Sequence, residues 1–291
     1  MISLVTMQTA AGIWRCECVV ALLRAKVHLP HLAQGDEPSV RILHREEGRY
    51  AVARVRAAVL EGEADAAVHS AEDLPGPDHE KLEVIAILPR CDPRDALYSS
   101  NGAAFARLGR GARVGAAGTV RAAQLAELRP DLCIVELVDG DAAGVERVGH
   151  DLDAVVVPAI ALELLGLPAC ERFPLGKLVP GVGRGAIALE VRAGQRRALE
   201  LLAELDDPRS RLQVMAERAV FRRLQAWPAQ NLGVAAEVQY GSVTLYGALA
   251  AGARSPVLRA QRSGPAAMAS QVAASVASAL LLQEGSASAW R

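Results

Sequence analysis

Residues 64–75 read Ala64-Asp65-Ala66-Ala67-Val68-His69-Ser70-Ala71-Glu72-Asp73-Leu74-Pro75, and they decide the fold. Their first half is a short apolar run, which is typical of a strand buried inside a sheet. Their second half reads as a loop that follows this strand. Open α/β sheets bind their ligands at the carboxyl ends of strands. The stretch therefore predicts an α/β fold with a functional site after residue 70.

The pattern of strand and helix continues on both sides of this stretch. Apolar residues between Arg49 and Leu60 recur at helical spacing, which predicts a helix before the strand. Further strands are expected at 82–88, 133–138, 152–157 and 186–191, with helices at 121–128 and 159–165. This alternation favours an α/β architecture with largely parallel sheets.

A different pattern begins after Asp206-Asp207-Pro208. A helix is expected from Ser210 to Leu224, followed by two strands, Ala235–Tyr240 and Ser242–Leu249. A tight turn joins these strands, and a final helix is expected from about 266 to 282. A hairpin combined with helices predicts a small α+β domain at the C-terminus.

The composition limits the classes of partner. The 291 residues contain 32 Lys and Arg and 33 Asp and Glu, so the formal net charge is −1. This balance argues against a globally basic nucleic-acid binder. Aromatic residues make up only 3% of the chain, which argues against stacking platforms for single-stranded nucleic acid. We expect a small-molecule substrate and no nucleic-acid partner.

The cysteines and the two ends of the chain indicate the compartment. Five cysteines form no dense disulfide framework, and the N-terminus lacks the basic start of a secretory signal. The uncharged segment 264–282 contains several polar residues, so a docking helix is expected rather than a membrane anchor. Cys16-Glu17-Cys18 lacks the further ligands of a metal site. We expect a cytoplasmic monomer that binds neither a membrane nor a metal.

Two segments carry residues suited to chemistry. Glu72 and Asp73 are adjacent carboxylates that can move a proton or balance a cation. The alternative is a loop-capping Asp before a proline turn. The segment Arg113–Arg121 combines a strand, a small-residue turn and a helix start, which favours an anionic ligand. A tight packing turn is the alternative there. His69 suits a hydrogen bond in the core as well as a substrate contact.

Four motifs stand in the order and spacing of one known family: His69–Pro75, Ile87–Leu97, Gln124–Leu132 and Ala216–Ala219. Through them nearly the whole chain resembles hydroxymethylbilane synthase, also called porphobilinogen deaminase. The resemblance implies two lobes similar to those of periplasmic binding proteins, an active cleft between them and a third α+β domain. We expect lobe 1 at residues 1–92 with 179–205, lobe 2 at 93–178 and the C-terminal domain at 206–291.

The resemblance assigns the chemistry to Asp73. In the family, the Asp of this motif handles the proton of the substrate aminomethyl group. It also stabilises the cation left when ammonia departs, after which a pyrrole carbon attacks. A carboxylate beside a developing cation suits that chemistry. Asp73 is therefore expected to be catalytic with Glu72 assisting, and residues expected to bind substrate are Ser70, Thr9, Arg121, Arg184 and Trp227.

The family's cofactor attachment is not expected in this chain. The family joins a dipyrromethane primer to a Cys in a Gly-Gly-Cys turn of the third domain. Here Pro228 lies at or next to that position, and no cysteine follows Cys170. Proline has no nucleophile, so we expect no covalently attached dipyrromethane and no other cofactor.

Several arginines with which the family binds substrate carboxylates are also replaced. The N-terminal Arg position reads Met7, and only Arg121 remains of an Arg-Arg pair. The basic residue before the catalytic Asp is Glu72, and a hinge Gln has become Arg184. The remaining Arg positions fall at Val138-Asp139-Gly140 and near Gly144. Each lost partner of a buried charged hydrogen bond costs about 2–5 kcal/mol in binding, so a smaller and less acidic ligand is expected.

Three functions follow from these residues. The first is a repurposed enzyme that forms bonds by a deaminative or iminium-type route on a small (hetero)aromatic or amine substrate, with Asp73 as acid and base. The second is ordinary hydroxymethylbilane synthesis with an unconventional primer attachment. The third is a bilobal protein that binds a ligand without catalysis.

Overall fold

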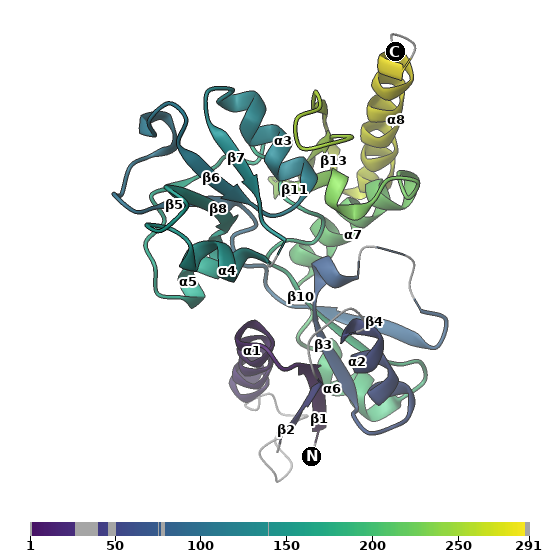
Figure 1. The fold of residues 1–291 in the computed structure, drawn as a ribbon. Coiled ribbons are helices and arrows are strands. Elements are labelled where there is room, and N and C mark those ends of the chain that lie inside the picture. The colour runs from purple at the N-terminus through teal and green to yellow at the C-terminus, as the bar shows by residue number, and fades with distance from the viewer. Residues whose placement is uncertain are drawn as a thin grey trace. The chain divides into compact units, whose positions relative to one another are not determined.

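The structure is a computed structural model that describes residues 2–26, 40–45, 51–74, 76, 79–138 and 140–288. The chain forms two compact units (Figure 1). The first contains Met1–Arg90 and Ala186–Arg211, and the second contains Cys91–Gly185 and Leu212–Arg291. The expected division into three domains stays a prediction. Arg49, Pro75 and Asp139, which the sequence analysis used, lie outside the described residues.

The first unit is built on a five-stranded sheet. Its strands, in spatial order, are β2 (Val40–Arg45), β1 (Ile2–Met7), β3 (Ala66–Ser70), β10 (Ile187–Arg192) and β4 (Leu82–Ile87). β1 runs parallel to β2 and β3, whereas β10 runs antiparallel to β3 and β4. A strand from late in the sequence therefore lies between β3 and β4.

Helices cover both faces of this sheet (Figure 1). α1 (Ala10–Lys26) and α6 (Arg196–Ala203) share a core with one face, and α2 (Ala51–Leu60) packs on the other. Successive residues of a strand point to opposite faces, so Val68 joins the α1 core and Ala67 joins the α2 core.

A second five-stranded sheet lies in the second unit. Its strands, in spatial order, are β7 (Cys133–Glu136), β6 (Arg113–Ala116), β8 (Ala154–Pro158), β5 (Asp95–Ser99) and β9 (Glu171–Arg172). The helices of this part are α3 (Thr119–Leu128), α4 (Gly140–Glu146) and α5 (Ala159–Leu164). The two β6 pairings are parallel and the two β5 pairings are antiparallel.

The C-terminal part of the second unit is a three-stranded antiparallel sheet of β11 (Leu232–Gln239), β12 (Ser242–Leu249) and β13 (Leu258–Pro265). α7 (Pro208–Arg223) precedes this sheet and α8 (Ala269–Ser288) follows it. By length and composition, the segment Ala266–Glu284 could cross a membrane. In the structure α8 packs on β12 and β13, with Val272, Ala273, Val276, Ala277 and Leu280 buried along one face.

Most predicted elements are confirmed to within a few residues, but two expectations are wrong. The sheets are not largely parallel, because each five-stranded sheet has two antiparallel pairings. The C-terminal hairpin has a third strand, β13, at the edge of its sheet. Its sequence includes Arg259, Gln261 and Arg262, and such polar residues hide a strand from an apolar pattern. The final helix is confirmed, because a short 3-10 turn over Ala266–Met268 leads into α8 at Ala269.

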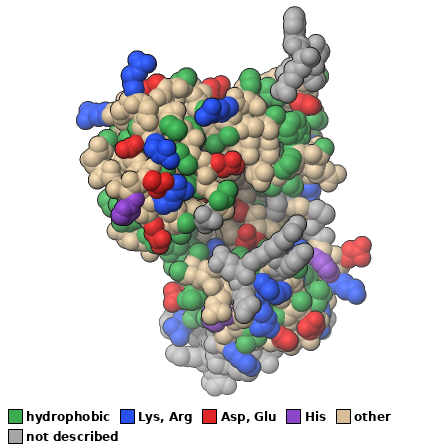
Figure 2. All heavy atoms as spheres, in the orientation of Figure 1, with side chains coloured by type: hydrophobic (Ala, Val, Ile, Leu, Met, Phe, Trp, Pro, Cys, Tyr) green, Lys and Arg blue, Asp and Glu red, His purple; other side chains and the backbone are tan. Residues whose placement is uncertain are grey.

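Both signs of charge occur on one face of the molecule. On the face drawn in Figure 2, Lys and Arg side chains are interspersed with Asp and Glu side chains. This distribution agrees with the formal net charge of −1.

Candidate functional site

The carboxyl end of β3 places the two predicted catalytic carboxylates. β3 ends at Ser70, whose extended backbone leads into a 3-10 turn over Ala71–Asp73. Two backbone hydrogen bonds hold this turn: Ala71 N donates to Ala186 O at 2.9 Å and Leu74 N donates to Ala71 O at 3.2 Å. Glu72 and Asp73 are both half-buried. The short turn therefore fixes Asp73 at the end of a central strand.

Asp73 has the electrostatics of a carboxyl that can exchange a proton. Its Oδ2 is buried and has no hydrogen-bond partner within the described part of the chain. Burial raises the pKa of Asp73, while the charges of Arg15 and His69 and a backbone hydrogen bond from Ser70 act in the opposite direction. A raised carboxyl pKa brings proton exchange closer to neutral pH, as general acid–base catalysis requires.

Arg15 is the functional residue that sequence reasoning missed. It lies on α1, a helix that no sequence pattern predicted. Its Nε is buried and has no hydrogen-bond partner within the described residues. Burial lowers the pKa of Arg15, and the charges of Asp73 and Glu72 partly restore it. The surroundings of Asp73 therefore include a cation that the sequence analysis did not name.

The start of α1 explains how Arg15 comes close to Asp73. Thr9 caps this helix, because its Oγ1 accepts a hydrogen bond from Gly12 N at 2.9 Å. A Cβ at Gly12 would collide with Met7 O, so only glycine lets α1 approach the end of β1 this closely. Thr6 is fully buried and donates to Val68 O at 3.0 Å, which joins the ends of β1 and β3. Thr9, expected at the substrate, thus has a structural role in this geometry.

A buried row of charges lies behind the Asp73 turn. His69 and Glu190 have side chains that are each 1% exposed, and their Nε2 and Oε2 atoms are 3.3 Å apart. Arg56 donates two hydrogen bonds of 2.8 Å to Glu190. Burial alone would raise the pKa of Glu190, but His69 and Arg56 lower it to about 2. Glu190 is therefore a carboxylate at neutral pH.

The second unit holds Arg121, which the sequence analysis assigned to an anionic ligand. Arg121 is 4% exposed, and its guanidinium makes two hydrogen bonds of 3.0 Å to the carboxylate of Asp95. A further hydrogen bond of 2.9 Å reaches Asp141. In this geometry the guanidinium donates hydrogen bonds to two carboxylates of the protein itself. A ligand contact to Arg121 stays a prediction.

Arg184 and Trp227 also belong to the second unit. Arg184 lies in a turn where its backbone N donates to Gly181 O at 3.2 Å. The residue before Arg184, Gly183, donates a backbone hydrogen bond of 2.7 Å to Glu217. Glu217 is fully buried and accepts a second hydrogen bond of 2.7 Å from Ala236 N. Trp227 packs against the core of the C-terminal sheet. This contact supports a space-filling role for Trp227, and its contact with substrate stays a prediction.

The predicted residues therefore fall into two groups. Ser70, Glu72, Asp73 and Thr9 belong to the first unit, where the structure adds Arg15. Arg121, Arg184 and Trp227 belong to the second unit. Within the residues that the structure describes, no group of three His, Cys, Asp or Glu side chains is arranged to hold a metal ion.

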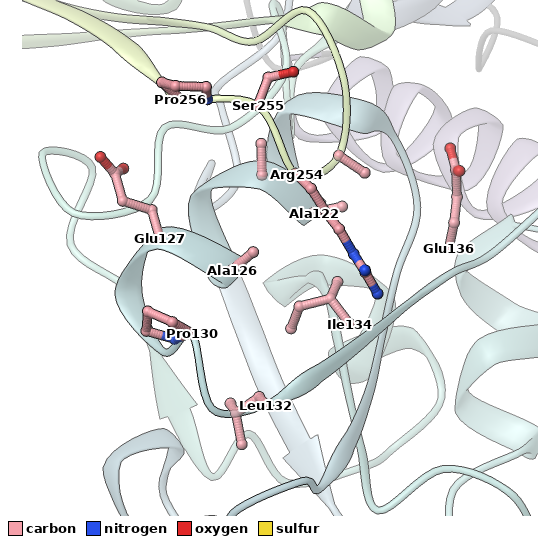
Figure 3. A pocket seen from close by; sticks show the side chains of 12 residues that line it. Ala122, Ala126, Glu127, Pro130, Leu132, Ile134, Glu136, Arg254, Ser255 and Pro256 are labelled. Atoms are coloured by element: carbon pink, nitrogen blue, oxygen red, sulfur yellow. The ribbon is translucent and has the colours of Figure 1, made fainter.

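A separate pocket of about 620 Å³ lies within the second unit (Figure 3). Its walls come from α3, β7 and the loop 253–256. Ile134 and Arg254 lie in its middle, and Glu127 and Glu136 lie at opposite sides. None of the residues predicted for the functional site lines this pocket.

Comparisons with known structures concern the fold. The chain is similar to the Methionine Binding Protein MetQ, with 14% identity, a TM-score of 0.44, and coverage of 70% of this chain and 89% of that one. It is also similar to a periplasmic substrate-binding protein of an ABC transporter from Coxiella burnetii, with 17% identity, a TM-score of 0.44, and coverage of 75% and 95%. The expected fold class is confirmed by the elements themselves, since two five-stranded sheets with helices precede a C-terminal part of helices and a three-stranded antiparallel sheet.

Comparisons of sequence are more specific. Residues 2–200 match the family described as "Porphobilinogen deaminase, dipyromethane cofactor binding domain". A porphobilinogen deaminase from Roseiflexus castenholzii is 36% identical over 239 residues, which cover 81% of this chain and 78% of that protein. One from Syntrophotalea carbinolica is 36% identical over 233 residues, which cover 79% and 74%. The chain therefore belongs to the porphobilinogen deaminase family.

Proposed function

We propose that this chain is an enzyme that forms a carbon–carbon bond with loss of ammonia, and that Asp73 is its acid and base. The observation that carries the proposal is the Asp73 carboxyl itself. Its Oδ2 is buried without a hydrogen-bond partner among the described residues, and burial raises its pKa. A carboxyl in this state can give a proton to a leaving amine and then stabilise the cation that forms.

The proposed reaction balances through Asp73. The protonated carboxyl donates its proton to the amine of an aminomethyl-substituted (hetero)aromatic ring. The C–N bond breaks, ammonia leaves with the bonding electron pair, and a cationic azafulvenium or iminium remains beside the Asp73 carboxylate. A nucleophilic ring carbon of a second molecule attacks this cation, and its ring proton returns to Asp73.

Charges around Asp73 support a smaller and less acidic substrate than a tetrapyrrole chain. Glu72 adds a second carboxylate to the turn, which repels substrate carboxylates and attracts an amine. Arg15 supplies one cation that interacts with both carboxylates. One arginine that interacts with two carboxylates suits a ligand that carries both an amine and a single anionic group.

We further propose that the enzyme works without covalently attached dipyrromethane. Attachment needs a thiolate, but the turn at the attachment position offers Trp227 and the exposed Pro228. Elsewhere, Cys16 is fully buried and burial raises its pKa to about 12, which keeps it protonated at neutral pH. The residues at the attachment position therefore do not fit the covalent cofactor, because none of them carries a thiol.

We propose that the protein is a cytoplasmic monomer. It acts on a small molecule and has no nucleic-acid or membrane partner. All five cysteines are free thiols, which supports a reducing compartment. Light scattering of the purified chain tests the monomer, because a mass near 30.6 kDa is expected and twice that mass would contradict it.

A second candidate is ordinary hydroxymethylbilane synthesis. The names of the two relatives that are 36% identical favour it. It requires porphobilinogen to yield a linear tetrapyrrole and ammonia. Binding without catalysis is the third function, and it requires a ligand that stays chemically unchanged.

The test is incubation of the purified chain with porphobilinogen, followed by measurement of ammonia and product masses. If the enzyme acts on an altered substrate, we expect no linear tetrapyrrole. If it is an ordinary hydroxymethylbilane synthase, we expect this product from wild type and its loss in Asp73→Asn. Aminomethylpyrroles that carry one carboxylate or none are then compared. Ammonia release from them by the wild type and by Glu63→Gln, but not by Asp73→Asn, supports the proposal. Binding of these compounds with no ammonia release would overturn it.

Mass spectrometry of the intact chain tests the cofactor separately. The proposal predicts the mass of the polypeptide alone after expression in cells that make porphobilinogen. A mass increase equal to two pyrrole units, stable to denaturation, would show a covalent primer and contradict this part of the proposal.

A further inference from the structure

We propose that the pocket between α3, β7 and the loop 253–256 is a further ligand site, which binds a monocarboxylate with an apolar body through the guanidinium of Arg254. This site is separate from Asp73, because none of the residues predicted for catalysis or substrate binding lines the pocket. The inference goes beyond the proposed function and does not depend on it.

The first argument is the size and the lining of the pocket. Its volume is about 620 Å³, which lies within the range of roughly 300–1,000 Å³ typical of small-molecule sites. Most of its walls are apolar. They include the side chains of Ala122, Ala126, Pro130, Leu132, Ile134 and Pro256. Such walls suit the apolar body of an aromatic or aliphatic ligand.

The second argument is the cation in the middle of the pocket. Figure 3 shows the Arg254 side chain extending from the loop across the pocket in the direction of Ile134. Its guanidinium makes no hydrogen bond or ion pair with any residue that the structure describes. A guanidinium is a planar set of donors that binds a carboxylate bidentately. A ligand carboxylate therefore complements the one cation of the described pocket lining.

The two carboxylates of the lining limit the ligand to one anionic group. Glu127 and Glu136 lie at opposite sides of the pocket (Figure 3). Arg259 pairs with Glu127, with its Nη2 2.7 Å from Oε2, whereas Glu136 has no ion pair within the described part of the chain. Like charges brought together oppose binding, so a second anionic group on the ligand would be repelled. We therefore expect a monocarboxylate instead of a polycarboxylate.

The third argument is that contacts within the second unit hold the walls in place. Ala253 packs against the core beneath α3 and β7, and Ser255 N donates to Gly252 O at 3.0 Å. Arg259 on β13 donates to Gln124 Oε1 on α3 at 3.0 Å, which joins the C-terminal sheet to this helix. The loop is thus fixed over α3 before a ligand arrives. A preformed site lowers the ordering cost of binding.

The experiment uses hydrocinnamate, which joins one carboxylate to an apolar ring, and the full chain with ¹³C-labelled isoleucine methyl groups. Ile134 on β7 lines the pocket, and its signal is assigned by its absence from Ile134→Val. Ile160 on α5 does not line the pocket and serves as the internal control. We expect a saturable shift of the Ile134 signal, with a Kd in the millimolar range typical of so small a ligand, and no shift of the Ile160 signal.

Arg254→Gln tests the guanidinium. We expect this variant to bind hydrocinnamate about fivefold or more weakly than wild type, because the charged hydrogen bonds are lost. Arg107→Gln replaces an exposed arginine of the same unit outside the pocket, so it is the matched control and leaves the Kd unchanged. Equal affinities of wild type and Arg254→Gln would overturn the proposal. The same holds for the absence of a saturable Ile134 shift up to about 20 mM hydrocinnamate.

Hydrocinnamamide tests the same point without any variant. It has the ring and chain of hydrocinnamate but no charge, so wild type should bind it about fivefold or more weakly than the acid. Equal binding of the amide and the acid would contradict the proposal. None of these measurements involves ammonia release, so failure of this site and failure of the chemistry at Asp73 are distinguishable.

Discussion

The carboxylate of Asp95 accepts two hydrogen bonds of 3.0 Å from the guanidinium of Arg121, and both side chains are almost completely buried. Such a bidentate pair is strong and directional. It ties the start of α3 to the first residue of β5. Arg121, which the sequence predicts to bind substrate, thus links two elements of the second unit.

Removal of the Arg121 side chain should therefore destabilise the protein. In Arg121→Met the carboxylate of Asp95 stays buried without its main partner, and we expect a loss of about 3–5 kcal/mol in the free energy of unfolding. Urea unfolding followed by circular dichroism measures it. Arg147→Met is the matched control, because Arg147 pairs with Asp151 at the surface, and a loss below about 1 kcal/mol is expected.

The double variant Arg121→Met, Asp95→Leu separates a structural role from a ligand role. If the pair is structural, apolar replacement of both partners restores most of the lost stability. Wild-type stability in Arg121→Met alone would show instead that the guanidinium is available to a ligand.

The turn at Asp73 could be predicted from sequence because its information is local. An apolar run that ends in His69-Ser70 and is followed by Glu72 and Asp73 indicates a buried strand with carboxylates at its end. The structure confirms this arrangement at β3. The alternation of strands and helices along the chain likewise indicates the α/β class.

Arg15 could not be found in this way, because its position depends on contacts between distant segments. The apolar residues of α1 are spread around the helix instead of forming one stripe, so helical periodicity gives a weak signal. Its approach to Asp73 further requires Gly12 and the pairing of β1 with β3. The insertion of β10 beside β3, which brings Glu190 to His69, is equally invisible to a local pattern.

Asp73→Asn should stabilise the protein at neutral and alkaline pH. Burial raises the pKa of Asp73 in the folded chain, so folding favours the protonated form. The contribution of such a group is most favourable below the unfolded pKa and is lost as pH rises through the folded pKa. Asparagine avoids this loss. We expect a higher midpoint of thermal unfolding than wild type at pH 8 and no difference near pH 3.

The stabilisation in Asp73→Asn should be accompanied by loss of ammonia release, since stability and activity commonly oppose each other at functional carboxyls. Thermal scans at one-unit steps between pH 3 and pH 8 provide the measurement. A variant that is less stable than wild type at pH 8 would show that the attraction between Asp73 and Arg15 outweighs burial.

Glu190→Gln should show the opposite dependence on pH. The folded pKa of Glu190 is about 2, below its ordinary value of 4.5, because His69 and Arg56 outweigh burial. Its stabilisation is present above the unfolded pKa and is lost as pH falls through about 2. The folded and ordinary pKa values of Glu190 differ by about 2.5, which corresponds to roughly 3 kcal/mol. We expect Glu190→Gln to lose that much free energy of unfolding at pH 7, measured by urea unfolding. The difference in stability between the variant and wild type should narrow below about pH 4.5.

Arg56→Met tests the partner of Glu190. Arg56→Met removes the other half of the same pair and should weaken the protein at pH 7 as well. If Glu190→Gln were as stable as wild type at pH 7, the row behind Asp73 would not contribute to folding.

Gly12→Ala should disturb the approach of α1 to the end of β1. A Cβ at this position meets the carbonyl oxygen of Met7, which is backbone and cannot rotate away. Insertion of a methyl group into a tightly packed site costs about 1–3 kcal/mol. Alanine otherwise favours a helix over glycine, so a net loss of stability would come from the collision.

Gly109→Ala is the matched control, because a Cβ there meets no atom within 4 Å. We expect Gly12→Ala to unfold at a lower urea concentration than both wild type and Gly109→Ala. The displaced helix should also move Arg15 relative to Asp73 and thereby change the midpoint of the Asp73 carboxyl titration. An unchanged midpoint together with reduced stability would show that Arg15 acts on Asp73 independently of how closely α1 packs, and equal stability would show that β1 yields to the added methyl group.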